Sequence, residues 1–198
     1  MGRRGKAHNA QRKAHKVFQQ GIMKSLKLPL KDSDIRSLKA GESLLLSGKI
    51  YTARDAVHKI LVGLIKNKRR LLISLRGITI YYCGPTPAPP GRVIGSCGPT
   101  TSARMDAFTP ILLKTGVKAM IGKGRRSKYV KEAIKKYRAV YFLAPAGCGA
   151  LLSRRVKKKR LVAYEDLGPE AIYELEVENF PVIVGIDSKG KDIFEKSS

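Results

Sequence analysis

The chain has 198 residues, of which 43% are hydrophobic, and this supports a single globular domain with a substantial core. No apolar run approaches the roughly 20 residues that cross a bilayer, so the sequence argues against a membrane protein. The formal net charge of +25 suits a nucleic acid, an acidic membrane surface or an acidic partner protein. Trp is absent and the basic runs hold no aromatic residue except Phe18, so stacking on bases has little support. A solvated lysine-rich surface explains the charge of the body equally well.

Residues 1–30 carry a large share of this charge. They contain eight Lys or Arg and no acidic residue, and they lack the apolar core and cleavage site of a secretory signal. We expect a basic arm over residues 1–30, partly helical around residues 14–26, followed by one domain over residues 31–198. The three cysteines (Cys83, Cys97 and Cys148) form no close pair along the chain, which disfavours a disulfide framework and indicates a reducing, cytoplasmic location.

From Leu38 onward, short apolar strands alternate with amphipathic helices, and this alternation predicts an α/β fold with a mixed sheet covered by helices. The prolines and glycines of residues 83–91 predict a rigid, extended loop. Gly116 stands where a helix C-cap is expected, and residues 187–190 carry a hairpin signal. The expected strands are 43–48, 49–52, 78–82, 93–94, 118–121, 139–143, 161–164 and 175–187, and the expected helices are 54–66, 102–115, 128–137 and 146–155.

The segment from Gly95 to Asp106 is the most informative part of the chain. It delivers two adjacent hydroxyls, Thr100 and Thr101, to the expected start of a helix, and Arg104 follows one turn later. Backbone N–H groups at a helix start, together with a guanidinium, bind carboxylates or phosphates. A hydroxyl in that positive field loses its proton more easily and is a candidate base or nucleophile. The plainer interpretation is a helix N-cap.

Two further cations stand at positions typical of ligand binding. Arg54 begins an expected helix, where a cation opposes the macrodipole, and Lys123 lies between two glycines at the exit of an expected strand. For each of them a solvated surface charge is the alternative.

Residues 116–123 lack the spacing and the hydroxyl of a phosphate-binding loop, and residues 147–152 lack the third glycine of a dinucleotide fingerprint, so both motifs are rejected. His58 is interpreted as a packing residue, and residues 154–160 form a second basic cluster.

Five ordered motifs resemble the β subunit, or C-terminal domain, of class I iron–sulfur fumarate hydratases and L-tartrate dehydratases. The resemblance covers about residues 35–195 and leaves the basic arm outside it. Cys97, in place of a small apolar residue, and the segment around Cys148 depart from the family pattern. The motifs are Tyr-Thr-Ala-Arg-Asp-Ala-Val-His at 51–58, Tyr-Cys-Gly-Pro at 82–85, Gly-Pro-Thr-Thr-Ser-Ala-Arg-Met-Asp at 98–106, Met-Ile-Gly-Lys-Gly at 120–124 and Ala-Tyr-Glu-Asp-Leu-Gly-Pro-Glu-Ala at 163–171.

The resemblance implies a swivelling β/β/α domain that completes an active site with a separate α subunit in an αβ or α2β2 assembly. It implies that Thr100 is the base that removes a proton from C3 of malate, and that Arg54, Arg104 and Lys123 hold the substrate carboxylates. It also implies a [4Fe-4S] cluster ligated by the α subunit, whose open iron polarises the C2 hydroxyl, so that no metal ligand is expected in this chain. The implied activity, present only with the α subunit, is the interconversion of fumarate and (S)-malate.

Three alternatives stay open at this point, and one of them is a scaffold role without catalysis. L-tartrate dehydratase is the alternative within the same family, because both substrates are four-carbon dicarboxylates. A basic nucleic-acid-binding protein is the alternative of another class, and it predicts sequence-specific binding that survives deletion of residues 1–30. Non-specific binding through the arm alone is the only nucleic-acid contact that the leading interpretation expects.

Overall fold

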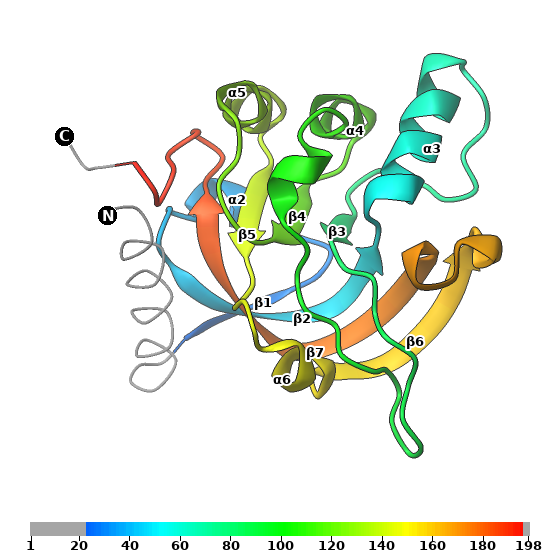
Figure 1. Cartoon of the computed structure of the whole chain (residues 1–198). Coiled ribbons are helices and arrows are strands. Elements are labelled where there is room, and N and C mark those ends of the chain that lie inside the picture. The colour runs from blue at the N-terminus through cyan, green and yellow to red at the C-terminus, as the bar shows by residue number, and fades with distance from the viewer. Residues whose placement is uncertain (1–22, 196–198) are drawn as a thin grey trace, which may run out of the picture.

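The computed structural model describes residues 23–195, which form one seven-stranded mixed sheet with helices around it (Figure 1). The strand order is β1-β2-β3-β4-β5-β7-β6, and β2 also pairs with β7. This extra pairing closes β2, β3, β4, β5 and β7 into a small barrel. The strands are β1 (Lys24–Lys27), β2 (Ser43–Thr52), β3 (Thr79–Tyr81), β4 (Ala119–Gly122), β5 (Val140–Leu143), β6 (Val156–Ala163) and β7 (Ile172–Ile186).

Parallel and antiparallel pairings divide the sheet. Each pair along the series β1 to β5 is parallel, whereas β7 runs antiparallel to β2, β5 and β6. The predicted α/β class with a mixed sheet is therefore confirmed. The helices are α2 (Asp32–Ser37), α3 (Asp55–Lys66), α4 (Thr109–Thr115), α5 (Lys128–Tyr137) and α6 (Gly149–Ser153), with 3-10 turns η1 (Ser102–Met105) and η2 (Glu165–Glu170).

The strands separate two hydrophobic clusters, because successive side chains point to opposite faces. All five barrel strands contribute to one cluster, in which Tyr81, Phe142 and Phe180 are fully buried, and this cluster fills the barrel. The second cluster joins the outer face of the sheet to α3, α4 and α5, which lie side by side on that face in Figure 1.

Several expected elements appear: α5 has its predicted bounds, α3 begins one residue later than expected, and Gly116 is the left-handed C-cap of α4. The two strands expected at 43–52 are one strand, because Gly48 forms a bulge rather than a turn. The helix expected at 102–115 breaks into η1 and α4. Residues 93–94 form no strand, the helix expected at 146–155 shrinks to α6, and the second basic cluster lies mostly within β6.

The sheet begins inside the predicted basic arm. Residues 24–27 form β1, which pairs with β2, and Leu26 and Leu30 are buried in the barrel cluster. The helix expected around residues 14–26 is therefore wrong for residues 24–26, because Leu26 packs into the sheet; its earlier part lies outside the described residues. The arm itself stays a prediction for the residues before 23. Within residues 23–195, every helix is too short or too polar to cross a membrane.

Candidate active site

Thr100 and Lys123 are brought together by the ends of neighbouring strands. The N–H of Thr100 donates to the carbonyl of Tyr82 at 2.7 Å, and Tyr82 N–H donates to Ile121 at 2.9 Å, so the Thr100 segment follows the end of β3 beside β4. Thr101 then forms an isolated parallel bridge with Lys123. Thr100 and Lys123 are both half-buried. Two of the four predicted site residues thus lie on adjoining segments.

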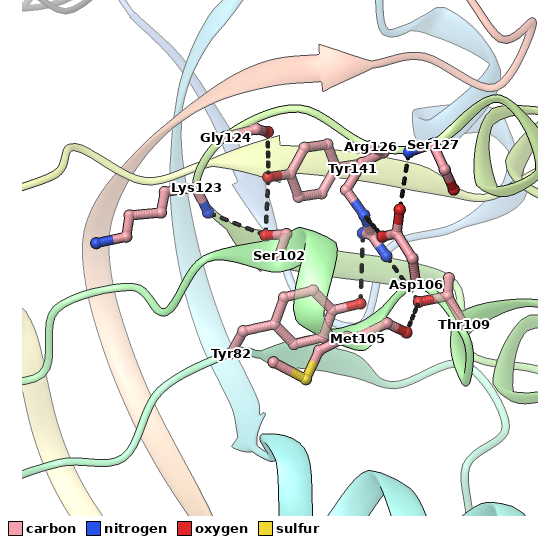
Figure 2. Close-up of polar contacts among 10 residues, drawn as sticks. All are labelled: Tyr82, Ser102, Met105, Asp106, Thr109, Lys123, Gly124, Arg126, Ser127 and Tyr141. Carbon is pink, nitrogen blue, oxygen red and sulfur yellow. Dashed lines mark hydrogen bonds and ion pairs between the residues drawn. The ribbon is translucent and has the colours of Figure 1, made fainter.

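The two glycines around Lys123 have separate physical reasons. A Cβ on Gly122 would lie 2.0 Å from Ser102 Oγ and 2.8 Å from the Tyr82 ring, so only glycine allows η1 to pack against the end of β4. Gly124 has a φ of +83°, which favours glycine. The strand can therefore end abruptly at Lys123, and in Figure 2 the Lys123 side chain points away from the buried residues.

The other two predicted residues, Arg54 and Arg104, converge on one carboxylate. Arg104 binds Asp55 through two nitrogens, with Nε at 2.9 Å from Oδ1 and Nη2 at 2.8 Å from Oδ2. Arg54 Nε lies 3.4 Å from Asp55 Oδ2 and 3.4 Å from Glu170 Oε1. Glu170 also accepts the N–H of Ala56 at 3.0 Å. Asp55 and Glu170 thus complement the positive end of α3, which is why a cation is tolerated at its start.

Thr100 does not stand at the start of a long helix. The expected long helix is the four-residue turn η1, and the N–H of Ser102 donates to Lys123 instead of remaining free. The expectation of a helix N-terminal anion site is therefore wrong. Thr101 occupies the N-cap position but makes no capping hydrogen bond, so the plainer interpretation does not describe it either.

A buried polar cluster behind the site was not foreseen from the sequence (Figure 2). Arg126, whose side chain is fully buried, donates from Nε to Asp106 at 2.6 Å and from Nη2 to Thr109 at 2.7 Å. Its guanidinium stacks on the rings of Tyr82 and Tyr141, at 5.4 and 5.0 Å from their centres. Burial opposes its charge, but the two tyrosine oxygens and the Asp106 carboxylate together raise the pKa of Arg126 above its ordinary value.

The sequence carries a weak signal for this cluster. Arg126 stands in the run Gly-Lys-Gly-Arg-Arg, where it is indistinguishable from Arg125, which is exposed. Asp106, however, ends the motif that contains Thr100 and Arg104 and is an acidic residue in a chain that has few. An acidic residue next to two predicted site residues, in a chain this basic, indicates a specific cationic partner.

His58 lies buried behind Arg54. Its Nδ1 contacts the carbonyl of Arg54 at 2.9 Å, its ring packs edge-on against Tyr82, and its Nε2 is buried without a partner. Burial lowers the pKa of His58 to about 4, so the ring is neutral at physiological pH. The expected packing role is confirmed, and the hydrogen bond additionally holds the first turn of α3.

The second basic cluster faces glutamates across the sheet. Lys157, Lys158 and Arg160 on β6 each form an ion pair with β7. The partners are Glu178 at 3.2 Å, Glu176 at 3.2 Å and Glu174 at 3.3 Å, respectively. The charge of this cluster is thus partly balanced within the protein, which weakens its support for nucleic-acid binding.

The thiols of this chain do not fit the role of iron–sulfur ligands. Cys83 and Cys97 are fully buried in the hydrophobic cluster that fills the barrel, which leaves no space beside them for an iron–sulfur cluster, and burial raises the pKa of both thiols. Cys148 is half-buried and lies apart in the sequence. Within residues 23–195, no three His, Cys, Asp or Glu side chains are grouped as a metal site would require.

Comparison with known proteins identifies the family. Residues 4–197 match the family model described as the fumarase C-terminus. A putative L(+)-tartrate dehydratase subunit beta of Methanocaldococcus jannaschii is 41% identical over 173 residues, which cover 84% of this chain and 89% of the relative. The L(+)-tartrate dehydratase subunit beta of Escherichia coli K12 is 34% identical over 89% of both chains.

Fumarate hydratases are similar over only part of their length. The class I anaerobic fumarate hydratase of Escherichia coli K12 is 35% identical over 181 residues, which cover 89% of this chain but 33% of that enzyme. The chain thus spans about a third of the fumarate hydratase and nearly the whole of the tartrate dehydratase β subunits. Because the fumarase C-terminus model matches almost the whole of this chain, the chain belongs to the fumarase C-terminus family of hydro-lyase β subunits and domains.

Proposed function

We propose that this chain is the β subunit of an iron–sulfur-dependent hydro-lyase that interconverts fumarate and (S)-malate. The observation that carries the proposal is the gathering of the predicted site residues: Thr100 and Lys123 on adjoining segments, and Arg54 and Arg104 on one carboxylate. Three cations and a hydroxyl on neighbouring segments are the groups that a dianionic substrate losing a proton would require. The names of the relatives support the same reaction class.

Each residue has a definite part in this proposal. Arg54, Arg104 and Lys123 bind the two carboxylates, because guanidinium and ammonium groups form charge-assisted hydrogen bonds with them. Thr100 takes the proton from C3 of malate and returns it in the reverse direction. The neighbouring cations favour its deprotonated form and thereby lower the barrier to that transfer.

The remaining parts of the site are proposed to come from a partner. An α subunit would hold a [4Fe-4S] cluster that supplies Lewis acidity for the C2 hydroxyl, since the thiols of this chain do not fit that role. The fold would act as a swivelling domain that closes the shared site, in an αβ or α2β2 assembly. The free cysteines favour the cytoplasm as its location.

The decisive experiment measures malate dehydration by this chain, alone and after anaerobic assembly with its α subunit. We expect activity only in the assembled complex; full activity of the isolated chain would overturn the proposal. Thr100→Val should lower kcat about 10²- to 10⁴-fold, the range for loss of a general base. Thr101→Val is the matched control, because it removes the adjacent, exposed hydroxyl, and it should change kcat less than about threefold.

L-tartrate is the second candidate substrate. The relatives that this chain covers along 89% of their length are β subunits of tartrate dehydratase by name. Comparing kcat/KM for malate and L-tartrate on the same assembled complex decides between the substrates. A kcat/KM at least tenfold higher for tartrate would replace fumarate hydratase by tartrate dehydratase without changing the roles of the residues.

A further inference from the structure

Two buried hydroxyls hold the strand end that carries Lys123. Ser102 is fully buried in η1, two residues after Thr100, and Tyr141 is 1% exposed on β5. Figure 2 shows both side chains behind Lys123, between the turn that follows Thr100 and the end of β4. Neither residue reaches the open side of the site, so neither can contact a substrate.

The hydrogen bonds of these hydroxyls form a closed circuit. Lys123 N–H donates to Ser102 Oγ at 3.0 Å, and Ser102 N–H donates to the Lys123 carbonyl at 2.9 Å. The Tyr141 hydroxyl lies 2.9 Å from Ser102 Oγ and 2.9 Å from the carbonyl of Gly124. Each hydroxyl has one hydrogen, so all contacts are satisfied only if Ser102 donates to Tyr141 and Tyr141 donates to Gly124.

This order fixes the backbone on both sides of the Lys123 side chain. The N–H and carbonyl of Lys123 and the carbonyl of Gly124 are each engaged, and Gly122 leaves the space that Ser102 Oγ occupies. The same residue, Ser102, belongs to the turn between Thr100 and Arg104. Ser102 therefore links the backbone of Lys123 to the turn that carries Thr100 and Arg104.

The tyrosine is itself held in place and kept protonated. The buried Arg126 guanidinium stacks on its ring at 5.0 Å and is in turn anchored by Asp106. Burial raises the pKa of Tyr141 well above its ordinary value, although the Arg126 cation opposes this effect. The hydroxyl therefore remains a donor to Gly124 at every pH at which the enzyme would work.

We propose that Ser102 and Tyr141 are positioning residues that lock Lys123 against the Thr100–Arg104 turn through their hydrogen-bonded hydroxyls. The proposal rests on the proposed function for the role of Lys123. Tyr141→Phe removes the circuit but keeps the ring on Arg126, and Ser102→Ala removes the other hydroxyl. Tyr173→Phe is the matched control, because the Tyr173 hydroxyl also donates to a glycine carbonyl, Gly168, at 3.1 Å.

The kinetic test uses the complex assembled with the α subunit and a double-mutant cycle. Tyr141→Phe and Ser102→Ala should each lower kcat/KM about tenfold, and the double variant should be no worse than about twofold below either, because both break one circuit. In a Lys123→Ala background, Tyr141→Phe should change kcat/KM less than about twofold. An equal loss with and without Lys123, or an equal loss in Tyr173→Phe, would overturn the proposal.

A second measurement separates this proposal from the proposed function. In the full chain alone, amide hydrogen exchange at Lys123 should accelerate at least about tenfold in Ser102→Ala and in Tyr141→Phe, and remain unchanged in Tyr173→Phe. Unchanged exchange at Lys123 overturns the lock, whatever the activity. If the assembled wild type hydrates no dicarboxylate, the proposed function fails, while the exchange rates still decide whether the two hydroxyls hold Lys123.

Discussion

The molecule contains two groups of ion pairs that differ in their surroundings. In the buried cluster, the Asp106 and Arg126 side chains are 8% and 0% exposed and lie 2.6 Å apart. In the ladder between β6 and β7, the Lys158 and Glu176 side chains are 77% and 45% exposed and lie 3.2 Å apart. The ladder has more pairs, but Asp106 and Arg126 are held by more hydrogen bonds than the exposed pair of Lys158 and Glu176. The number of charges therefore says little about where the stability of this protein resides.

The physical difference lies in what happens when one partner is lost. An exposed charge returns to water and is screened, so its pair contributes little. A buried charge cannot be hydrated when its partner is lost. Arg126 is enclosed by Tyr82, Tyr141 and Thr109 as well as by Asp106. The variants below test this contrast, beginning with the largest expected effect.

Asp106→Ala should lower the free energy of unfolding by about 3–5 kcal/mol, because it leaves Arg126 buried without its counter-ion. It also removes the acceptor of Ser127 N–H, which lies 2.8 Å from Asp106 Oδ2 at the start of α5. Urea unfolding followed by circular dichroism measures the change. The double variant Asp106→Leu with Arg126→Met should recover much of the loss; a double variant as unstable as Asp106→Ala would contradict the explanation by an unpaired charge.

Acidification should destabilise the protein by up to about 3 kcal/mol through His58 alone. Its pKa is lowered to about 4 by burial, from 6.5 in the unfolded chain, so the unfolded state binds more protons as the pH falls between these values. Stability is therefore complete above pH 6.5 and declines towards pH 4. Urea unfolding at pH 7.0, 6.0 and 5.0 tests this, and His58→Leu should flatten the dependence. The same slope in wild type and variant would assign it to other groups.

Asp55→Asn should raise KM for the dicarboxylate about tenfold with little change in kcat, because the two guanidiniums lose the carboxylate that orients them. Asp32→Asn is a matched control: Asp32 also stands in the first turn of a helix and pairs with a cation, Lys118. Steady-state kinetics of the assembled complex give both constants. A fall in KM would mean that Asp55 competes with the substrate instead of preparing its site.

Glu176→Ala is the exposed counterpart of Asp106→Ala. It deletes one carboxylate of the ladder and should change the free energy of unfolding by less than about 0.5 kcal/mol. Because salt screens the wild-type pair, the difference in unfolding free energy between wild type and Glu176→Ala should shrink as salt is added. A loss approaching that of Asp106→Ala would show that the ladder acts as a cooperative network, and the contrast between the two regions would fail.

Sequence reasoning selected side chains that lie on neighbouring segments, and it described the backbone around them less well. The spacing of Val57 and Leu61 predicted α3, and Gly116 marked the end of α4 correctly. Thr100 and Lys123 were selected separately and lie on adjoining segments. The helix and its cap are predictable because residues close together in the sequence determine them.

The failures have a shared cause in long-range contacts. Gly48 was expected to form a turn, but the shifted pairing with β7 shows that it is a bulge in a continuous strand. A Cβ at this position would lie 2.8–3.1 Å from atoms of Leu28, which is distant from it in the sequence. The barrel closure depends on β2 meeting β7, more than a hundred residues later. The sequence does not distinguish Arg126 from the exposed Arg125, because its partner Asp106 lies 20 residues away. Burial is a property of the assembled fold, and the local pattern does not contain it.

Closure of the barrel has a consequence for how this protein behaves in concentrated solution. Among the described strands, only β1 and β6 lie at the ends of the strand order, where unpaired backbone groups can recruit a strand from another molecule. Both are lysine-rich, with Lys24 and Lys27 on β1 and the run Lys157–Lys159 on β6. Lysines on an edge strand oppose such pairing by repulsion and by the cost of desolvating them. Part of the large positive charge thus serves to keep neighbouring copies of the sheet apart.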